Sequence, residues 1–226
     1  MRLALTLLGV GVFWLCQTIG GAYPQPITNI EADLERVEDI HGGAGPWAVA
    51  GFRMGRAALR ALGFTAQVPH TSQERFELYV VHVMPQFFTN GLLGGYIQLS
   101  SIADGLHAAT GASIGKANLK ICPLEGRPNP TRTDLITFAL QNTRSIIVSR
   151  KPNQPQRCVE LTVTQNFAVN YMNLPFGELV AKGREVMTLP DEAIFTLREL
   201  RECPPPPPDE CRDVLLPFLN LQRNPT

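Results

Sequence analysis

The sequence predicts an α+β fold in which helices pack on one face of an antiparallel β-sheet. Apolar residues recur at helical spacing through most of the first half of the chain, and runs rich in β-branched residues predominate later. Helices followed by strands favour a sheet that carries its helices on one side. Of the 226 residues, 44% are hydrophobic and 18% are charged, which is enough apolar material for one core.

Helical periodicity identifies three helices before residue 110 and one after it. Pro46 is well placed to begin the second helix, and Gly63 to end it. Gly51 and Gly55 within that helix indicate close packing against another backbone. The predicted helices cover residues 27–40, 46–62, 97–109 and 178–186.

Strand signals come from β-branched and apolar runs bounded by turn residues. The predicted strands cover residues 76–84, 134–140, 144–148, 158–164 and 193–197, and a further apolar stretch, 117–121, follows a glycine-punctuated turn. Five consecutive prolines, 204–208, favour a polyproline II segment that cannot join a packed core. The residues after Asp213 are apolar enough to form a docking helix.

The first 22 residues have the pattern of a secretory signal peptide. Arg2 precedes an uncharged apolar run, 3–16, and small residues precede a cleavage point after Ala22. An uncleaved anchor is the alternative, but the run is short for a membrane span. The chain is therefore expected to be exported, periplasmic or secreted, without stable membrane insertion after cleavage. Residues 23–202 would form the folded domain, and residues 203–226 a proline-rich tail.

Export changes the interpretation of the cysteines. Besides Cys16 there are four, Cys122, Cys158, Cys203 and Cys211, and an even number in an oxidising compartment favours disulfides with three possible pairings. A local Cys203–Cys211 bridge would leave Cys122 to pair with Cys158. Metal ligation is the rival interpretation, but the chain contains no Cys-x-x-Cys.

Charge and motifs exclude several function classes. The chain has 20 basic and 20 acidic side chains, so nothing favours a nucleic-acid partner. The segment from Gly111 to Lys116 is one residue short of a phosphate-binding loop and lacks its Ser or Thr. No Gly-x-Ser-x-Gly nucleophile elbow occurs, which argues against a hydrolase of that class.

The histidines are the strongest candidates for chemistry. His41 is followed by glycines and is predicted to lie just before a helix N-terminus, which would keep its imidazole uncharged. Asp104 and His107 are three residues apart on one predicted helix, so they share a face. Each also has a structural interpretation: His41 as a helix-junction residue, and Asp104 with His107 as a surface pair. His82 is predicted to be a satisfied core histidine.

Two sequence blocks resemble the signatures of the FmdE family, which is named after a component of formylmethanofuran dehydrogenase. The first is His41-Gly42-x-x-x-Pro46 followed by Gly51-x-Arg53-x-Gly55, and the second is Ala103-Asp104-Gly105-x-x-x-Ala109-Thr110-Gly111-x-x-x-Gly115-Lys116-x-Asn118-Leu119. A later Leu189-Pro190-Asp191-Glu192 is similar to the end of the family's domain. The resemblance covers about residues 30–200.

The chain departs from the family pattern where the family has thiols and imidazoles. Gly43 stands in place of a second histidine, and Gly45, Ser101 and Ala112 in place of cysteines, while His107 replaces a glutamine. Serine, glycine and alanine neither bind soft metals nor act as nucleophiles as thiolates do. The connection between His82 and Ser101 is longer than is usual in the family, and residues 86–96 within it are predicted to form a loop over the site.

The resemblance implies a site rather than a defined reaction. His41, Asp104 and His107 are candidate ligands for zinc, nickel, copper or iron, or for a small molecule. Gly111, Gly115, Lys116 and Asn118 of the second block are candidate cofactor-binding residues.

The family's own reaction needs a pterin cofactor and iron–sulfur partners in the cytoplasm, so formylmethanofuran dehydrogenase activity is not expected. The resemblance also implies a homodimer, with the small residues of 51–62 as its packing surface. Two other functions remain open: a non-catalytic binding or scaffold module, and hydrolysis by a metal-bound water with Asp104 as base. The sequence does not decide whether the chain is an enzyme.

Overall fold

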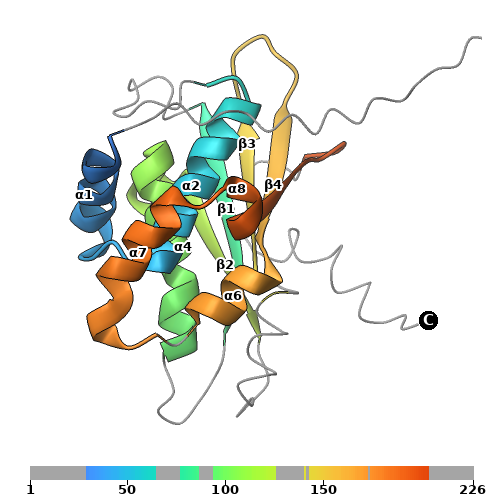
Figure 1. Ribbon diagram of the computed structural model, residues 1–226. Helices are drawn as coiled ribbons and strands as arrows, with labels where there is room; N and C mark the ends of the chain where they lie inside the picture. Colours follow the sequence, from blue (N-terminus) through green and yellow to red (C-terminus); the bar gives the residue numbers. More distant parts are fainter. Residues whose placement is uncertain are drawn as a thin grey trace, which may run out of the picture.

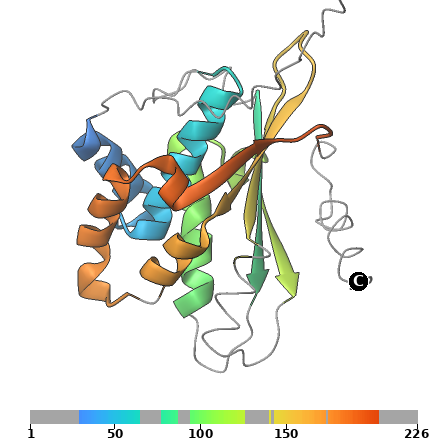
Figure 2. The same cartoon turned by 45° about the vertical axis from the view of Figure 1, so that its right-hand side comes forward.

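A computed structural model describes residues 29–64, 77–86, 94–125, 140, 143–172 and 174–203. Figures 1 and 2 show a single twisted sheet with the helices gathered on one side of it. The predicted signal peptide, residues 134–139 of the strand predicted over 134–140, most of the loop over 86–96 and the tail after residue 203 lie outside the described residues. None of the described helices is long and apolar enough to cross a membrane.

The helices confirm the four predicted segments within a few residues. They are α1 (Ile30–His41), α2 (Pro46–Ala61), α4 (Gly94–Thr110) and α7 (Leu179–Thr188), with two short helices that were not predicted, α6 (Gln165–Tyr171) and α8 (Asp191–Ile194). Among the described residues there are also two 3₁₀ turns, η1 (Ile114–Lys116) and η2 (Phe176–Glu178).

Local capping explains several helix ends. Asn29 accepts a hydrogen bond from the backbone N–H of Ala32 at the start of α1. Gly42, with φ 80°, ends the same helix in the left-handed conformation that glycine favours. Gly63, with φ 72°, follows α2 as predicted.

In the described part of the chain, five strands form the sheet, in the order β2-β1-β3-β4-β5. They are β1 (Leu78–Gln86), β2 (Leu119–Glu125), β3 (Arg144–Ser149), β4 (Arg157–Val163) and β5 (Phe195–Glu199). The pairs β1–β3, β3–β4 and β4–β5 are antiparallel, whereas β1 and β2 are parallel. The predicted α+β class is confirmed, and the sheet is antiparallel except at β2, because α4 crosses over between two strands that run in the same direction.

Both faces of the sheet are buried, in two separate apolar clusters. The larger cluster joins the helices to one face of the sheet, through residues such as Phe52, Leu106, Val80, Ile147 and Leu161. The smaller lies on the opposite face, which we call the outer face. It consists of Tyr79, Val81, Val83, Cys122, Ile146, Val148 and Cys158.

Glycines let α2 and α4 approach each other closely, as predicted. A Cβ atom added at Gly105 would lie 1.9 Å from the backbone oxygen of Ala48, and one added at Gly51 would lie 2.2 Å from that of Ile102. Every residue of α2 from Pro46 to Leu59 is buried. The small-residue face that the resemblance offered as a dimer surface is thus already covered by α4 of the same chain.

One disulfide joins Cys158 of β4 to Cys203, with 5.6 Å between the two Cα atoms. This bond excludes the local Cys203–Cys211 bridge and the Cys122–Cys158 pair that would accompany it. Proximity in sequence was a poor guide because β5 carries the chain back along β4, so that Cys203 returns to the neighbourhood of Cys158.

Candidate functional site

The fold brings His41 and Asp104 together although 63 residues separate them. Nδ1 of His41, at the end of α1, lies 2.8 Å from Oδ2 of Asp104, on α4. The His41 side chain is 25% exposed and that of Asp104 46% exposed, so the pair is open to solvent. A carboxylate that binds Nδ1 orients the ring and leaves Nε2 as the atom that can meet a ligand.

His41 does not occupy the helix position that the sequence predicts for it. It is the last residue of α1, with Gly42 as C-cap, and α2 begins only at Pro46. The nearest helix end is therefore a C-terminus, where the partial charge is negative. The sequence placed His41 outside any helix because the predicted first helix ended at residue 40, whereas α1 includes His41 as its last residue.

His107 does not complete a metal centre with this pair. It is partly buried on α4, three residues after Asp104. Across the described part of the chain, no three or more His, Cys, Asp or Glu residues form a group that could hold a metal ion. The three predicted ligands therefore do not constitute a preformed site of the kind that structural or catalytic zinc requires.

The positions at which the family has a second histidine and a cysteine are sterically open. A Cβ at Gly43 would meet no atom within 4 Å, and one at Gly45 would meet only Leu179 Cβ, at 3.9 Å. Gly45 is extended, with φ −72° and ψ 164°, so any side chain can adopt its conformation. The backbone therefore leaves room beside His41 for the side chains that the family has there.

The second family block forms a turn that satisfies its own polar groups. Thr110 Oγ1 donates to the Leu106 carbonyl at 2.7 Å and accepts the N–H of Ala112 at 3.1 Å. Asn118 Oδ1 accepts the N–H of Ser113 at 2.9 Å. Lys116 Nζ donates to the Gly111 carbonyl at 3.0 Å. These bonds connect the end of α4 to the start of β2.

The four predicted cofactor-binding residues belong to this turn and lie away from His41. Gly111 follows Asp104 by seven residues, which is about 10 Å along a helix axis. Gly111, with φ 69°, needs glycine for its left-handed backbone, whereas Gly115 has open space beside it. Asn118 is buried, and Lys116 is exposed. The polar contacts of Lys116 and Asn118 described above stay within the turn and the neighbouring strand.

His82 is a core histidine, as predicted. Its Nδ1 lies 3.0 Å from Ser145 Oγ and its Nε2 lies 3.2 Å from the carbonyl of Leu99. Burial lowers the pKa of His82 to about 4, although the bond to Leu99 opposes this effect. The side chain has no exposed surface, so it takes no part in binding.

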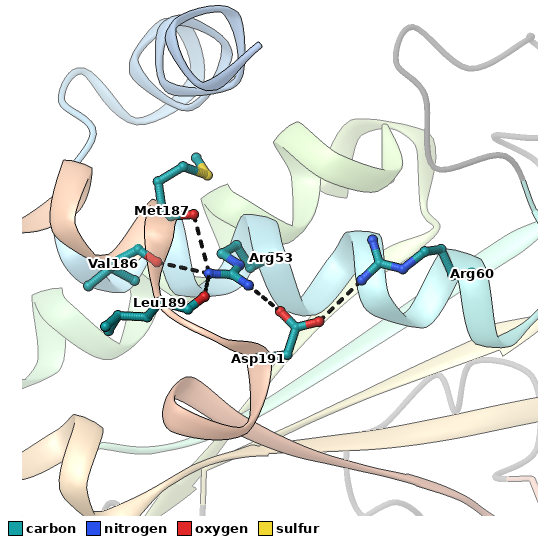
Figure 3. Close-up of polar contacts among 6 residues, drawn as sticks. All are labelled: Arg53, Arg60, Val186, Met187, Leu189 and Asp191. Atoms are coloured by element: carbon teal, nitrogen blue, oxygen red, sulfur yellow. Dashed lines mark hydrogen bonds and ion pairs between the residues drawn. The ribbon is translucent and has the colours of Figure 1, made fainter. Parts of the chain in front are cut away.

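Arg53 of the first block makes a buried junction with the last block (Figure 3). Its Nη1 donates to the carbonyls of Val186, Met187 and Leu189 at the end of α7, and its Nη2 lies 2.6 Å from Asp191 Oδ1. Arg60 Nη2 reaches the other oxygen of Asp191 at 3.2 Å. Arg53 and Asp191 both belong to the family blocks, but the contact between them was not predicted.

A surface cavity of about 560 Å³ lies between α6, α7 and α8. Its polar lining contains three carboxamides and two carboxylates, namely Gln165, Asn166, Asn170, Glu185 and Glu192. Tyr171 Oη donates to Glu185 Oε1 at 2.5 Å, and burial together with that carboxylate raises the pKa of Tyr171 to about 12. A second, smaller pocket lies between α1 and α7. Neither pocket is lined by His41, Asp104 or His107.

Comparison with known proteins identifies the family. A family model described as "FmdE, Molybdenum formylmethanofuran dehydrogenase operon" matches residues 40–196, which include both blocks and the Arg53–Asp191 junction. No curated protein matches the chain. Because the matched region is more than half of the 226 residues, the chain belongs to the FmdE family.

Proposed function

We propose that this chain is an exported FmdE-family domain in which the His41–Asp104 pair binds a small polar ligand, and that it is not a formylmethanofuran dehydrogenase. The observation that carries the proposal is the 2.8 Å contact between His41 Nδ1 and Asp104 Oδ2 in a part-exposed position. The contact uses one ring nitrogen for orientation and leaves the other for a ligand.

The chemistry of the pair favours a ligand with hydroxyl or amine groups. Nε2 of an Asp-oriented imidazole accepts a hydrogen bond when the ring is neutral and donates one when the ring is charged. The exposed carboxylate of Asp104 can accept a second bond from the same ligand. Open space at Gly42 and Gly43 leaves room for the ligand to approach the backbone.

A divalent metal at the same residues is the weaker form of this proposal. Zinc in proteins is held by three or four protein ligands, and the described residues offer no such group. The absence of the family's thiol and imidazole at Gly45 and Gly43 points in the same direction. A small organic ligand needs only the two groups that are in contact.

Export is supported by the cysteine chemistry. The Cys158–Cys203 disulfide ties β4 to the residues after β5. Disulfides persist in periplasmic and extracellular compartments and are rare in a reducing cytosol. This agrees with the predicted signal peptide over residues 1–22.

A second candidate is a non-catalytic binding module that uses the cavity between α6, α7 and α8. The specific observation in its favour is a cavity of about 560 Å³, within the range of small-ligand sites. Its carboxamides and carboxylates both donate and accept hydrogen bonds, which suits a polyhydroxylated molecule.

Ring-nitrogen NMR of the full chain, labelled at histidine, tests the site. Small alcohols, amines, carboxylates and zinc chloride would be titrated separately, and the His41 signals followed. We expect a hydroxyl- or amine-bearing fragment to shift the His41 signals of the parent protein and to lose this effect in Asp104→Asn. Glu192→Gln, in the cavity, is the matched control and should leave the shift intact.

The outcomes separate the candidates. Loss of binding in Glu192→Gln and not in Asp104→Asn would move the function to the cavity. If zinc chloride shifts the NMR signals of both His41 and His107, the metal-binding form of the proposal would be favoured. No response of His41 to any probe would overturn the proposal.

A further inference from the structure

The outer face of the sheet is buried, yet no described helix covers it. Val83 has no exposed surface, Tyr79 and Val81 are each 1% exposed, and all of the described helices lie on the other side of the sheet (Figure 2). Among the described residues, only Leu200 and Cys203 pack partly buried against this face. Five apolar strand side chains must therefore be shielded from solvent by residues other than Leu200 and Cys203. They are Tyr79, Val81, Val83, Ile146 and Val148.

The Cys158–Cys203 disulfide holds the end of the described chain at this face. Cys158 lies on β4 within the outer-face cluster, and Cys203 packs against the same cluster. The 23 residues that follow Cys203 begin there. They include Val214, Leu215, Leu216, Phe218 and Leu219, which is enough apolar material for the five side chains to be covered.

A second attachment point lies on the opposite side of the face. Cys122, on β2, belongs to the outer-face cluster and is disulfide-bonded. Since Cys158 and Cys203 bind each other, the partner must be Cys211 or Cys16. Cys16 lies in the predicted signal peptide and would be removed with it.

We propose that residues 204–226 form a strap across the outer face, pinned by a Cys122–Cys211 disulfide. The bond forms when the two thiols lose two protons and two electrons to a protein disulfide of the exporting compartment, which is reduced to two thiols. The strap closes the second apolar surface of the domain, so the occupant of this face is the chain's own tail and not a second copy.

The distances fit the strap. From β4 to β2 the sheet order β2-β1-β3-β4 has three interstrand steps, about 14 Å in all. From Cys203 to Cys211 there are eight residue steps, five of them at prolines, which span about 25 Å as polyproline II. A proline run also suits this crossing because it lacks N–H groups that would need partners over an apolar surface.

Non-reducing peptide mapping tests the pairing. Cys203 and Cys211 lie between Arg201 and Arg212, so trypsin alone leaves both in one peptide. A second cut before Asp209 separates them. We expect two independent disulfide-linked pairs, Cys158 with Cys203 and Cys122 with Cys211. A Cys122 bonded to Cys16 or to another chain, or a free Cys122, would overturn the proposal.

Two variants of the tail test whether it shields the outer face from solvent. Phe218→Ser should raise the fluorescence of a hydrophobic dye several-fold and retain both disulfides, whereas Gln222→Ser, in the same tail, should leave the dye signal unchanged. Cys211→Ser should make the Cys122 thiol reactive to a maleimide. Equal dye binding by the two tail variants, or an unreactive Cys122 in Cys211→Ser, would contradict the strap.

Discussion

The Arg53–Asp191 junction and the His41–Asp104 pair are both charged contacts from the family blocks, but they differ in surroundings. Arg53 is 5% exposed and binds three carbonyls as well as a carboxylate. His41 and Asp104 are part-exposed and contact each other at 2.8 Å. The first arrangement holds α7 and α8 onto α2, and the second leaves polar atoms facing solvent.

This difference indicates which parts of the blocks build the domain and which can serve chemistry. The Thr110–Asn118 turn and the Arg53 junction satisfy their polar groups internally and define the fold. Around His41 the backbone has room for the family's side chains, but glycine stands in their place. The contacts that build the fold and the side chains around His41 therefore belong to different residues, so one set can vary without the other.

The largest effect is expected from breaking the buried junction. Arg53→Ala would remove the closest partner of the Asp191 carboxylate. It would also remove the hydrogen bonds that Arg53 donates to three backbone carbonyls at the end of α7. Removing one member of such a buried pair costs about 3–5 kcal/mol of unfolding free energy. Urea titration followed by circular dichroism measures the change.

Arg184→Ala is the matched control, because Arg184 pairs with Glu31 on the exposed surface. It should leave the urea midpoint almost unchanged. If the two variants lose the same stability, the contrast between a structural junction and exposed pairs disappears.

A side chain added between the closely packed helices α2 and α4 should have the next largest effect on the unfolding free energy. Gly105→Ala places a methyl group 1.9 Å from the Ala48 backbone oxygen, so the helices must separate. Overpacking of this kind costs about 3 kcal/mol. Gly115→Ala, which has open space beside it, is the control and should be nearly neutral in thermal unfolding. A neutral Gly105→Ala would mean that the helices do not rely on close contact.

A pH titration should reveal the contribution of the buried His82 to stability. The folded-state pKa of His82 is lowered from 6.5 to about 4, so the unfolded chain binds a proton first as the pH falls. Stability from this group is fully present above pH 6.5 and is lost as the pH drops towards 4, by about 3 kcal/mol. The expected result is a fall in unfolding free energy between pH 7 and 4 that is smaller in His82→Gln. Equal slopes in the two proteins would contradict it.

Periodicity was sufficient for the elements that carry the core. Helical spacing located α1, α2, α4 and α7, and β-branched runs located β1, β3 and β4. The short helices α6 and α8 were not predicted, because seven and four residues make too few turns to show a helical periodicity of apolar residues. For β5 the strand begins at Phe195 rather than at 193, since α8 runs directly into it.

Long-range partners were harder to predict than elements. Only the family blocks related His41 to Asp104, and the bond between Arg53 and Asp191 was missed. A contact between residues 138 apart depends on how the elements pack and not on local sequence pattern. The disulfide was missed for the same reason: the pairing of β4 with β5, and not separation along the chain, decides which sulfurs meet.

The smallest effect on stability is expected at the proposed ligand site. Asp104→Asn keeps the size of the side chain and removes its charge, and an exposed ion pair contributes less than about 1 kcal/mol. Urea titration should therefore find Asp104→Asn close to the parent protein, while the NMR titration finds ligand binding impaired. That combination is what separates a binding residue from a structural one, since Arg53→Ala would lower stability and thereby weaken every property that depends on folding. A loss of stability in Asp104→Asn as large as that in Arg53→Ala would instead make the pair a structural link between α1 and α4, and the case for a ligand at His41 would fail.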